Sequence, residues 1–390
     1  MQESQARILI EKYRKGTLTD EERILLESWY LKLAEETELA EENAGRLGAA
    51  IENLGPPAIP ERKTPVRPLL KWAAVAASVL ILVSLAIVYR PDHHEETVVS
   101  SDPLLKEDAL PGQHRATLTL ADGSSIPLEK TGPGVLVKEN RVSIVKTGDG
   151  EIACNVAAGP GKPPGKVSYN KLETPKAGQY RVILPDGTRA WLNAASSIRF
   201  PALFPAGERV VEISGEVYFE VAKLRKNGRN IPFRVRSGVQ TVEVLGTVFN
   251  VNGYADEETT KTTLLEGSIR VIDNAHAGET VVLKPGQQTL LSAKIQGPAD
   301  SPRLDIKEVD TGSVVAWKEG YFRFDGVGLP ELMRQLSRWY DMEVVYETVV
   351  ADHEFVGRIE RDANLSKVLR ILELGGVRFR IEGKKIIVTD

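Results

Sequence analysis

The stretch VILPDGTRAWL, from Val182 to Leu192, decides the fold of the largest part of the chain. Apolar and polar residues alternate on both sides of its Asp-Gly pair, and this combination is the strongest short-range signal for a β-hairpin. A second copy, LTLADGSSIPL, runs from Leu118 to Leu128 and aligns with the first residue by residue. Two copies of one hairpin pattern predict a region built from repeated antiparallel strands.

Further turn signals follow the second copy at short intervals, with alternating apolar runs between them. They are the pairs Ser214-Gly215, Ser237-Gly238, Glu266-Gly267 and Pro285-Gly286. Regularly spaced turns of this kind are typical of an all-β domain. We therefore predict an all-β domain over residues 113–312, with a first repeat at 113–158 and a main part at 171–290. The sequence leaves open whether this domain is a sandwich or a solenoid-like stack.

The last part of the chain, residues 315–390, alternates between strands and helices. The strand YFRF, at residues 321–324, is followed by a helix from about Leu329 to Tyr340 and by the strand MEVVYE. A second round consists of FVGRI, a helix from Leu365 to Leu372 with Asn364 as its N-cap, and VRFRI. This order predicts a small α+β domain of two β-α-β units.

Upstream of the predicted strands lies an apolar run, WAAVAASVLILVSLAIVY, at residues 72–89. A helix of this length measures about 27 Å, which is close to the roughly 30 Å thickness of the hydrocarbon part of a bilayer. We therefore predict a single transmembrane helix. Lys and Arg residues crowd the segment before it, whereas the linker after it, residues 90–112, is acidic. The positive-inside rule then places residues 1–71 in the cytoplasm and the rest beyond the membrane.

Residues 1–53 are predicted to form a small all-α cytoplasmic domain. Their apolar residues recur at three-to-four spacing, and Thr19 with Glu22 forms a capping box at the start of a helix. So short a domain has a marginal core, so we expect a partner to complete its apolar face. The candidate residues of this face are Leu18, Leu25, Leu26, Trp29 and Tyr30. A Pro-rich basic linker, residues 54–71, leads to the apolar run.

Composition and motifs exclude several classes of function. Lys and Arg total 50 against 54 Asp and Glu, so no basic excess indicates direct binding of nucleic acid. The single cysteine, Cys154, excludes a disulfide scaffold and any multi-cysteine metal site. GPGKPPGK, at residues 159–166, lacks the glycine spacing of a phosphate loop, and the His93–Glu96 run lies in a predicted flexible linker. We predict that the chain is not an enzyme and has no catalytic, cofactor-binding or metal-binding residues.

Several stretches, in this order along the chain, resemble the FecR-type transmembrane anti-sigma factors of the Bacteroidetes kind. They are LPDGTRAWLNAASSIRFPALF (184–204), ISGEVYFEVAK (213–223), PFRV (232–235), VEVLGTVFNVNGY (242–254), TTLLEGSIRV (262–271) and LKPGQQ (283–288). Residues 315–390 are similar to the secretin and TonB short N-terminal modules. In residues 1–53 the resemblance rests on the order of segments and on the GTLTDEE helix junction.

The resemblance implies a single-pass protein of the bacterial inner membrane, with a cytoplasmic N-terminus and a periplasmic C-terminus. Such a protein binds an extracytoplasmic-function sigma factor inside the cell. In the periplasm it receives a signal from the signalling domain of a TonB-dependent outer-membrane transporter, for which sheet edges offer docking positions. Periplasmic and intramembrane proteases are further implied partners.

One pair of residues, Gly246 and Thr247, is a candidate self-processing junction, where the threonine hydroxyl would attack the preceding peptide bond. A glycine required by turn geometry is the alternative interpretation of this pair. For the whole chain, the alternative function is that of a non-enzymatic envelope structural or glycan-binding membrane protein. That alternative gives no role to a capped helical domain inside the cell.

Overall fold

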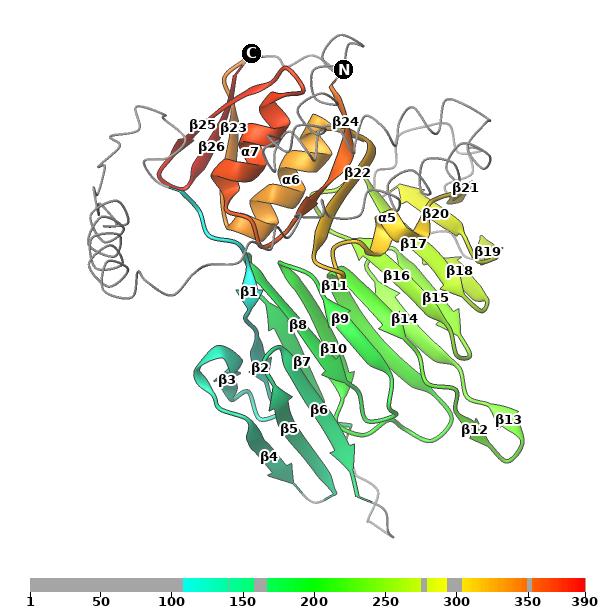
Figure 1. Cartoon of the computed structure of the whole chain (residues 1–390). Coiled ribbons are helices and arrows are strands. Elements are labelled where there is room, and N and C mark those ends of the chain that lie inside the picture. The colour runs from blue at the N-terminus through cyan, green and yellow to red at the C-terminus, as the bar shows by residue number, and fades with distance from the viewer. Residues whose placement is uncertain are drawn as a thin grey trace, which may run out of the picture. The chain divides into compact units, whose positions relative to one another are not determined.

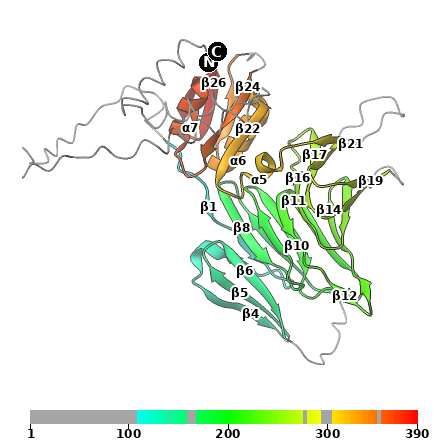
Figure 2. The same ribbon diagram turned by 45° about the vertical axis from the view of Figure 1, so that its right-hand side comes forward.

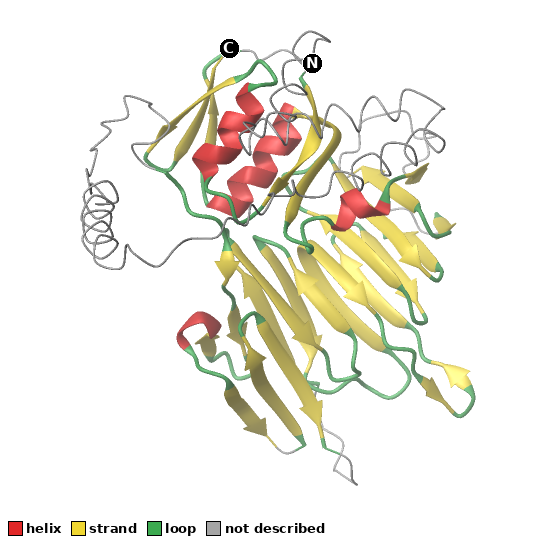
Figure 3. Ribbon diagram, viewed as in Figure 1, coloured by secondary structure: helices red, strands yellow, loops and turns green. Residues whose placement is uncertain are grey.

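The structure, a computed structural model, describes residues 108–139, 141–157, 167–274, 279–292, 304–348 and 353–389. All of them belong to one compact unit, Leu104–Asp390. Strands account for 55% of these residues and helices for 11%, and Figure 3 shows this predominance of strands. The described part of the chain is therefore mainly β-structure, as the repeated hairpin pattern predicted.

The fold class predicted from the sequence is corrected by this composition. It included a small all-α domain and a transmembrane helix, whereas the described residues are mainly strand and contain no helix long and apolar enough to cross a membrane. The longest helix among them has 12 residues, which corresponds to about 18 Å. The segments to which the prediction assigned helices, 1–53 and 72–89, lie outside the described residues, as does the linker 54–71.

Most strands form two sheets that face each other, and Figure 1 shows the strands running side by side. Neighbours in the first sheet are antiparallel, except that β11 and β14 run parallel. Its order is β3 (Ser125–Pro127), β2 (Thr117–Thr119), β7 (Tyr169–Thr174), β10 (Ser196–Pro201), β11 (Arg209–Glu220), β14 (Phe233–Ser237), β15 (Gln240–Val244), β18 (Ile269–Asp273) and β19 (Thr280–Leu283).

The second sheet is also mainly antiparallel, with β6 and β8 as a parallel pair. Its order is β4 (Gly134–Glu139), β5 (Val142–Gly148), β6 (Glu151–Val156), β8 (Gly178–Ile183), β9 (Arg189–Leu192), β11, β16 (Val248–Gly253), β17 (Thr259–Glu266), β20 (Gln287–Ser292) and β21 (Leu304–Glu308). Among the short elements, β1 (Gln113–His114) pairs with β8, and the 3₁₀ turn η2 (Leu128–Lys130) follows β3. The strands β12 (Arg225–Lys226) and β13 (Arg229–Asn230) form a separate two-stranded sheet.

Strand β11 belongs to both sheets. Residues 209–214 pair within the first sheet, and from Gly215 onward the strand pairs with β9 and β16 of the second. The Ser214-Gly215 pair, predicted to be a turn, is therefore a kink inside one long strand. Gly215 has φ of +76°, and an added Cβ would lie 2.4 Å from Ser196 Oγ. Only glycine fits this crossing without displacing its neighbours.

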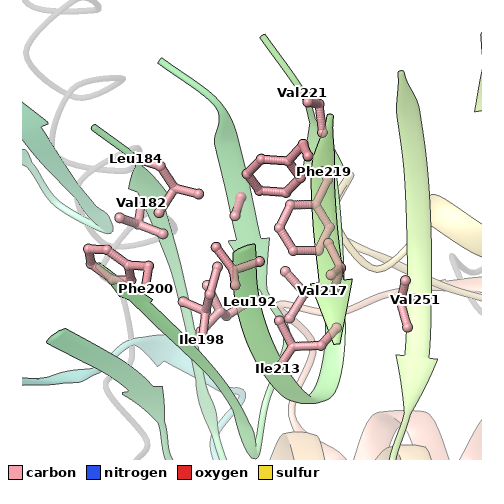
Figure 4. Packing of buried hydrophobic residues seen from close by; sticks show 14 of the residues in the cluster. Val182, Leu184, Leu192, Ile198, Phe200, Ile213, Val217, Phe219, Val221 and Val251 are labelled. Atoms are coloured by element: carbon pink, nitrogen blue, oxygen red, sulfur yellow. The ribbon is translucent and has the colours of Figure 1, made fainter. Parts of the chain in front are cut away.

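The space between the two sheets is filled by one continuous apolar core. Residues at alternate positions of each strand point into it, and Figure 4 shows side chains such as Phe200, Leu192 and Val217 gathered there. Phe219 of the second sheet packs against Phe233 of the first, with ring centroids 6.0 Å apart. The all-β region is therefore a two-layer sandwich, one of the two arrangements that the sequence left open.

The C-terminal domain contains two helices, and Figure 1 shows a small sheet on either side of them. Its elements are α5 (Thr311–Val315), β22 (Tyr321–Gly328), α6 (Leu329–Tyr340), β23 (Glu343–Tyr346), β24 (Glu354–Glu360), α7 (Leu365–Glu373), β25 (Arg378–Glu382) and β26 (Lys385–Thr389). Figure 2 shows the same domain from a second direction.

The prediction of two β-α-β units is wrong in its strand pairing. In such a unit the strands before and after a helix lie in one sheet, whereas here β22 pairs antiparallel with β24, and β23 pairs parallel with β26. Each helix therefore connects two different sheets. Both helices bury apolar stripes in a core to which both sheets contribute, so splitting the strands covers the helices on two sides.

Candidate functional site

A polar cavity of about 380 Å³ lies where the second sheet of the sandwich meets the C-terminal domain. We call it the interdomain cavity. Strands β11 and β16 present Glu216 and Asn250 to it, while the C-terminal domain contributes Arg338 from α6 and Arg361, which follows β24. All four side chains are buried. Burying charges at a domain boundary costs free energy unless they are paired or hydrogen-bonded, so the partners of these side chains show what stabilises the site.

An amide side chain connects the two domains across this cavity. Arg361 donates a hydrogen bond to Asn193 Oδ1 at 2.9 Å, and Asn193 Nδ2 donates in turn to Glu216 Oε2 at 2.8 Å. Asn250 donates to the other oxygen of Glu216 at 2.9 Å. The pairing of β9 and β16 on either side of β11 brings both amides to this carboxylate. A guanidinium and a carboxylate thus interact through Asn193 across the domain boundary.

Burial shifts the ionisation of both charged ends of this connection. It raises the pKa of Glu216, although the hydrogen bonds from Asn250 and Asn193 act in the opposite direction. Burial lowers the pKa of Arg361 to about 10, which still leaves the guanidinium charged at neutral pH. Arg361 also lies 3.7 Å above the ring of Trp339 and donates to the carbonyl of Trp317 at 2.9 Å. These contacts stabilise a buried cation.

A second connection joins α6 to the turn between β16 and β17. Arg338 donates to Asp256 at 2.9 Å, and Arg334, one helical turn earlier, donates to Glu257 at 2.6 Å. Arg338 also donates to Glu257 and stacks on the ring of Tyr254 at 4.0 Å. Burial alone would raise the pKa of Glu257, but the hydrogen bonds from the two arginines outweigh it and leave that pKa lowered. Charged groups therefore hold the two domains together.

Sequence reasoning did not identify the residues of the interdomain cavity. The apolar stripe of the helix at Leu329–Tyr340 is core, as the sequence indicated, but Arg338 within it is 6% exposed and carries the docking contacts. A cation inside an apolar stripe is the signal that could have found it. In the described part of the chain no group of three or more His, Cys, Asp or Glu side chains could hold a metal ion.

The site residues predicted from the sequence lie elsewhere. The apolar face of Leu18, Leu25, Leu26, Trp29 and Tyr30 is outside the described residues. Gly246 and Thr247 lie between β15 and β16, beside a separate cavity of about 370 Å³. Thr247 is 5% exposed, and its hydroxyl donates to the Ser268 carbonyl at 3.3 Å. The Gly246 backbone packs so closely on Lys223 that a Cβ would lie 2.1 Å from its Cγ.

Comparisons with known proteins agree with this two-domain arrangement. Residues 170–270 match the sequence model of the family described as FecR protein, and residues 321–388 match the one described as FecR, C-terminal. No curated protein matches the chain. Two crystal structures of a candidate anti-sigma factor from Parabacteroides distasonis are similar, both with a TM-score of 0.50. The first is 29% identical over 56% of this chain and 98% of that one, and the second 28% identical over 57% and 99%.

The main part of the sandwich and the C-terminal domain thus match the two FecR domain types. These domain matches and the similar anti-sigma factor structures confirm the resemblance to FecR-type anti-sigma factors found in the sequence. The anti-sigma factor family is regulatory rather than enzymatic.

Proposed function

We propose that this anti-sigma factor works at the bacterial inner membrane, with residues 1–71 in the cytoplasm and the two described domains in the periplasm. The N-terminal residues bind an extracytoplasmic-function sigma factor. The periplasmic domains receive the signal from a TonB-dependent outer-membrane transporter, and periplasmic and intramembrane proteases release the cytoplasmic part. The main support is the FecR domain followed by its C-terminal domain, docked through the buried contacts of Arg338 and Arg361.

Sigma-factor binding predicts a large effect at Trp29. Replacing a central aromatic residue of an interface typically costs at least about 2 kcal/mol, so Trp29→Ala is expected to weaken sigma-factor binding about 30-fold. The measurement is co-purification of an extracytoplasmic-function sigma factor with the tagged full chain, together with a reporter of that factor's promoter. Glu27→Ala is the control and should bind normally, because the helical spacing that defines the predicted apolar face puts Glu27 on the opposite side from Trp29. Capture by Trp29→Ala at the level of the parent chain would contradict the proposal.

Self-processing at Gly246-Thr247 is a separate part of the proposal. In this step Thr247 Oγ attacks the Gly246 carbonyl carbon, the peptide C–N bond breaks as the nitrogen takes the hydroxyl proton, and water then hydrolyses the ester. The close packing of Gly246 on Lys223 favours the alternative interpretation, in which this position requires a glycine for steric reasons. We expect Thr247→Ala to remain one band on a denaturing gel while the parent gives two. Identical single bands from both chains would rule self-processing out.

A further inference from the structure

The segment Asp108–His114 leads into the sandwich, and we call it the strap. Its first residue caps a helix that lies far along the chain. The backbone N–H of Ser366 donates to Asp108 Oδ1 at 2.9 Å, and the Ser366 hydroxyl donates to Asp108 Oδ2 at 2.7 Å. The N–H of Leu365 donates to the Ala109 carbonyl at 3.0 Å. The strap therefore satisfies N–H groups that α7 leaves without an intrahelical partner.

A local residue was available for this capping role. Asn364 occupies the N-cap position of α7, as the sequence predicted, but within the described part of the chain its side chain makes no capping hydrogen bond. Asp108, 258 positions earlier than Ser366, supplies the cap instead. Its carboxylate also lies at the positive end of the helix dipole, where a negative charge is favourable. The start of α7 thus depends on the strap being in place.

The strap then passes from the C-terminal domain to the sandwich within a few residues. The backbone of Gly112 lies against the ring of Trp339, where an added Cβ would come within 2.7 Å of Cε3. The next residue, Gln113, donates to the Ala177 carbonyl at 3.0 Å, and β1 pairs with β8 of the sandwich. Gly112 and Gln113 are consecutive, with Cα atoms about 3.8 Å apart, so the strap has no slack between the Trp339 contact and the sandwich.

Movement of the C-terminal domain away from the sandwich must therefore open one attachment of the strap. Either the 108–112 part leaves α7 and Trp339, or β1 leaves β8. The charged contacts of Arg334 and Arg338 with Asp256 and Glu257 hold the domains together, so these contacts also protect the strap. Undocking of the C-terminal domain and exposure of the strap are therefore expected to occur together.

We propose that the strap is a release element, which is held while the C-terminal domain is docked and freed when a partner protein draws that domain away. Its use in relaying a signal to the N-terminal residues rests on the proposed function. The holding itself does not, because it follows from contacts within the described chain. Freeing the strap lengthens the chain between the sandwich and the N-terminal residues, and it exposes backbone that docking covers.

Amide hydrogen exchange of the full chain in detergent tests this proposal. The variant combines Asp256→Asn with Glu257→Gln, so the arginines lose their anionic partners while the strap, α6 and α7 keep their sequence. We expect strap amides to exchange at least tenfold faster, with amides of β16 as protected as in the parent. Glu347→Gln is the control, because it removes an exposed ion pair with Arg380 in the same domain. Strap exchange equal to that of the control would overturn the proposal.

A second variant and a reporter separate this proposal from the proposed function. Asp108→Ala removes the cap directly and should speed exchange at the start of α7 as well as in the strap; unchanged exchange at both places would also overturn the proposal. In cells, the docking variant should alter transcription from the sigma-dependent promoter without an inducer. Faster strap exchange with unaltered transcription would support the strap and count against the proposed function.

Discussion

Replacing Arg209 with alanine is expected to lower the free energy of unfolding by about 3–5 kcal/mol. The Arg209 side chain is 1% exposed and pairs with Asp186, which is 3% exposed, at 2.7 Å. It also donates to the carbonyls of Ala222 and Ile231, each at 2.7 Å. The alanine variant leaves a buried carboxylate without its cation and two carbonyls without a donor. Loss of one partner of a buried ion pair is among the most destabilising single changes.

Urea unfolding followed by tryptophan fluorescence measures this effect. The control is Arg199→Ala, because Arg199 and its partner Glu212 are 43% and 46% exposed and their contact should contribute about 1 kcal/mol or less. The double replacement of Arg209 by Met and Asp186 by Leu should recover part of the lost stability, since no charge is then left buried. A loss below about 1 kcal/mol in Arg209→Ala would show that Asp186 finds solvent or another partner.

The second large effect is expected at the point where β11 changes sheets. Gly215→Ala should lower the free energy of unfolding by about 2–4 kcal/mol, because it combines strain in left-handed backbone with overpacking. The φ of Gly215 is +76°, and the new Cβ would meet both Ser196 Oγ and the Ala195 carbonyl, the latter at 2.7 Å. The carbonyl is backbone and cannot move aside as a flexible side chain could.

A matched glycine separates the two causes. Gly238 also has a positive φ, of +51°, but an added Cβ would have nothing within 4 Å. Gly238→Ala should therefore cost only the backbone strain, about 1 kcal/mol. The same urea experiment measures both variants. Equal losses would mean that crowding at Ser196 is relieved and that the crossing of β11 does not depend on glycine.

The first Asp-Gly stretch shows how far local sequence reasoning reaches. It predicts a hairpin, and β8 and β9 form one. Its earlier copy also forms a hairpin, from β2 and β3. The two aspartates nevertheless differ: Asp122 accepts hydrogen bonds from its neighbour Ser124 at the surface, whereas Asp186 is buried against Arg209. Nothing within either stretch distinguishes them, because the arginine comes from a different strand.

Glycine and helix-cap signals in the sequence were also ambiguous, because their structural role depends on partners from distant parts of the chain. A Ser-Gly pair indicates a turn, and at Ser237-Gly238 the chain does turn between β14 and β15. At Ser214-Gly215 the same signal marks a kink, because β11 has strand partners on both sides of the glycine. The position of Asn364 as N-cap was predictable from its neighbours. Its replacement by Asp108 as the capping side chain was not, since that contact exists only once the domains have folded together.

The interdomain cavity could not be predicted from spacing. Arg338 and Glu257 lie 81 positions apart, and Arg361 and Asn193 lie 168 apart. Their contacts depend on how the C-terminal domain docks, which no local pattern encodes. Helix periodicity did predict the buried stripe of α6, because amphipathic spacing reflects burial directly. Periodicity identifies the residues that are buried, and only tertiary structure identifies the partner of a buried charge.

The lone cysteine makes the sandwich chemically traceable. Cys154 lies in β6, is 5% exposed, and burial raises its pKa to about 12. Thiol reagents attack the deprotonated form, so the folded chain is nearly inert to them at neutral pH. Reaction at this position therefore requires β6 to open from its partners β5 and β8. Because the chain has only one cysteine, the rate at which it is labelled in intact cells measures how often the sandwich opens, and no engineered probe is needed.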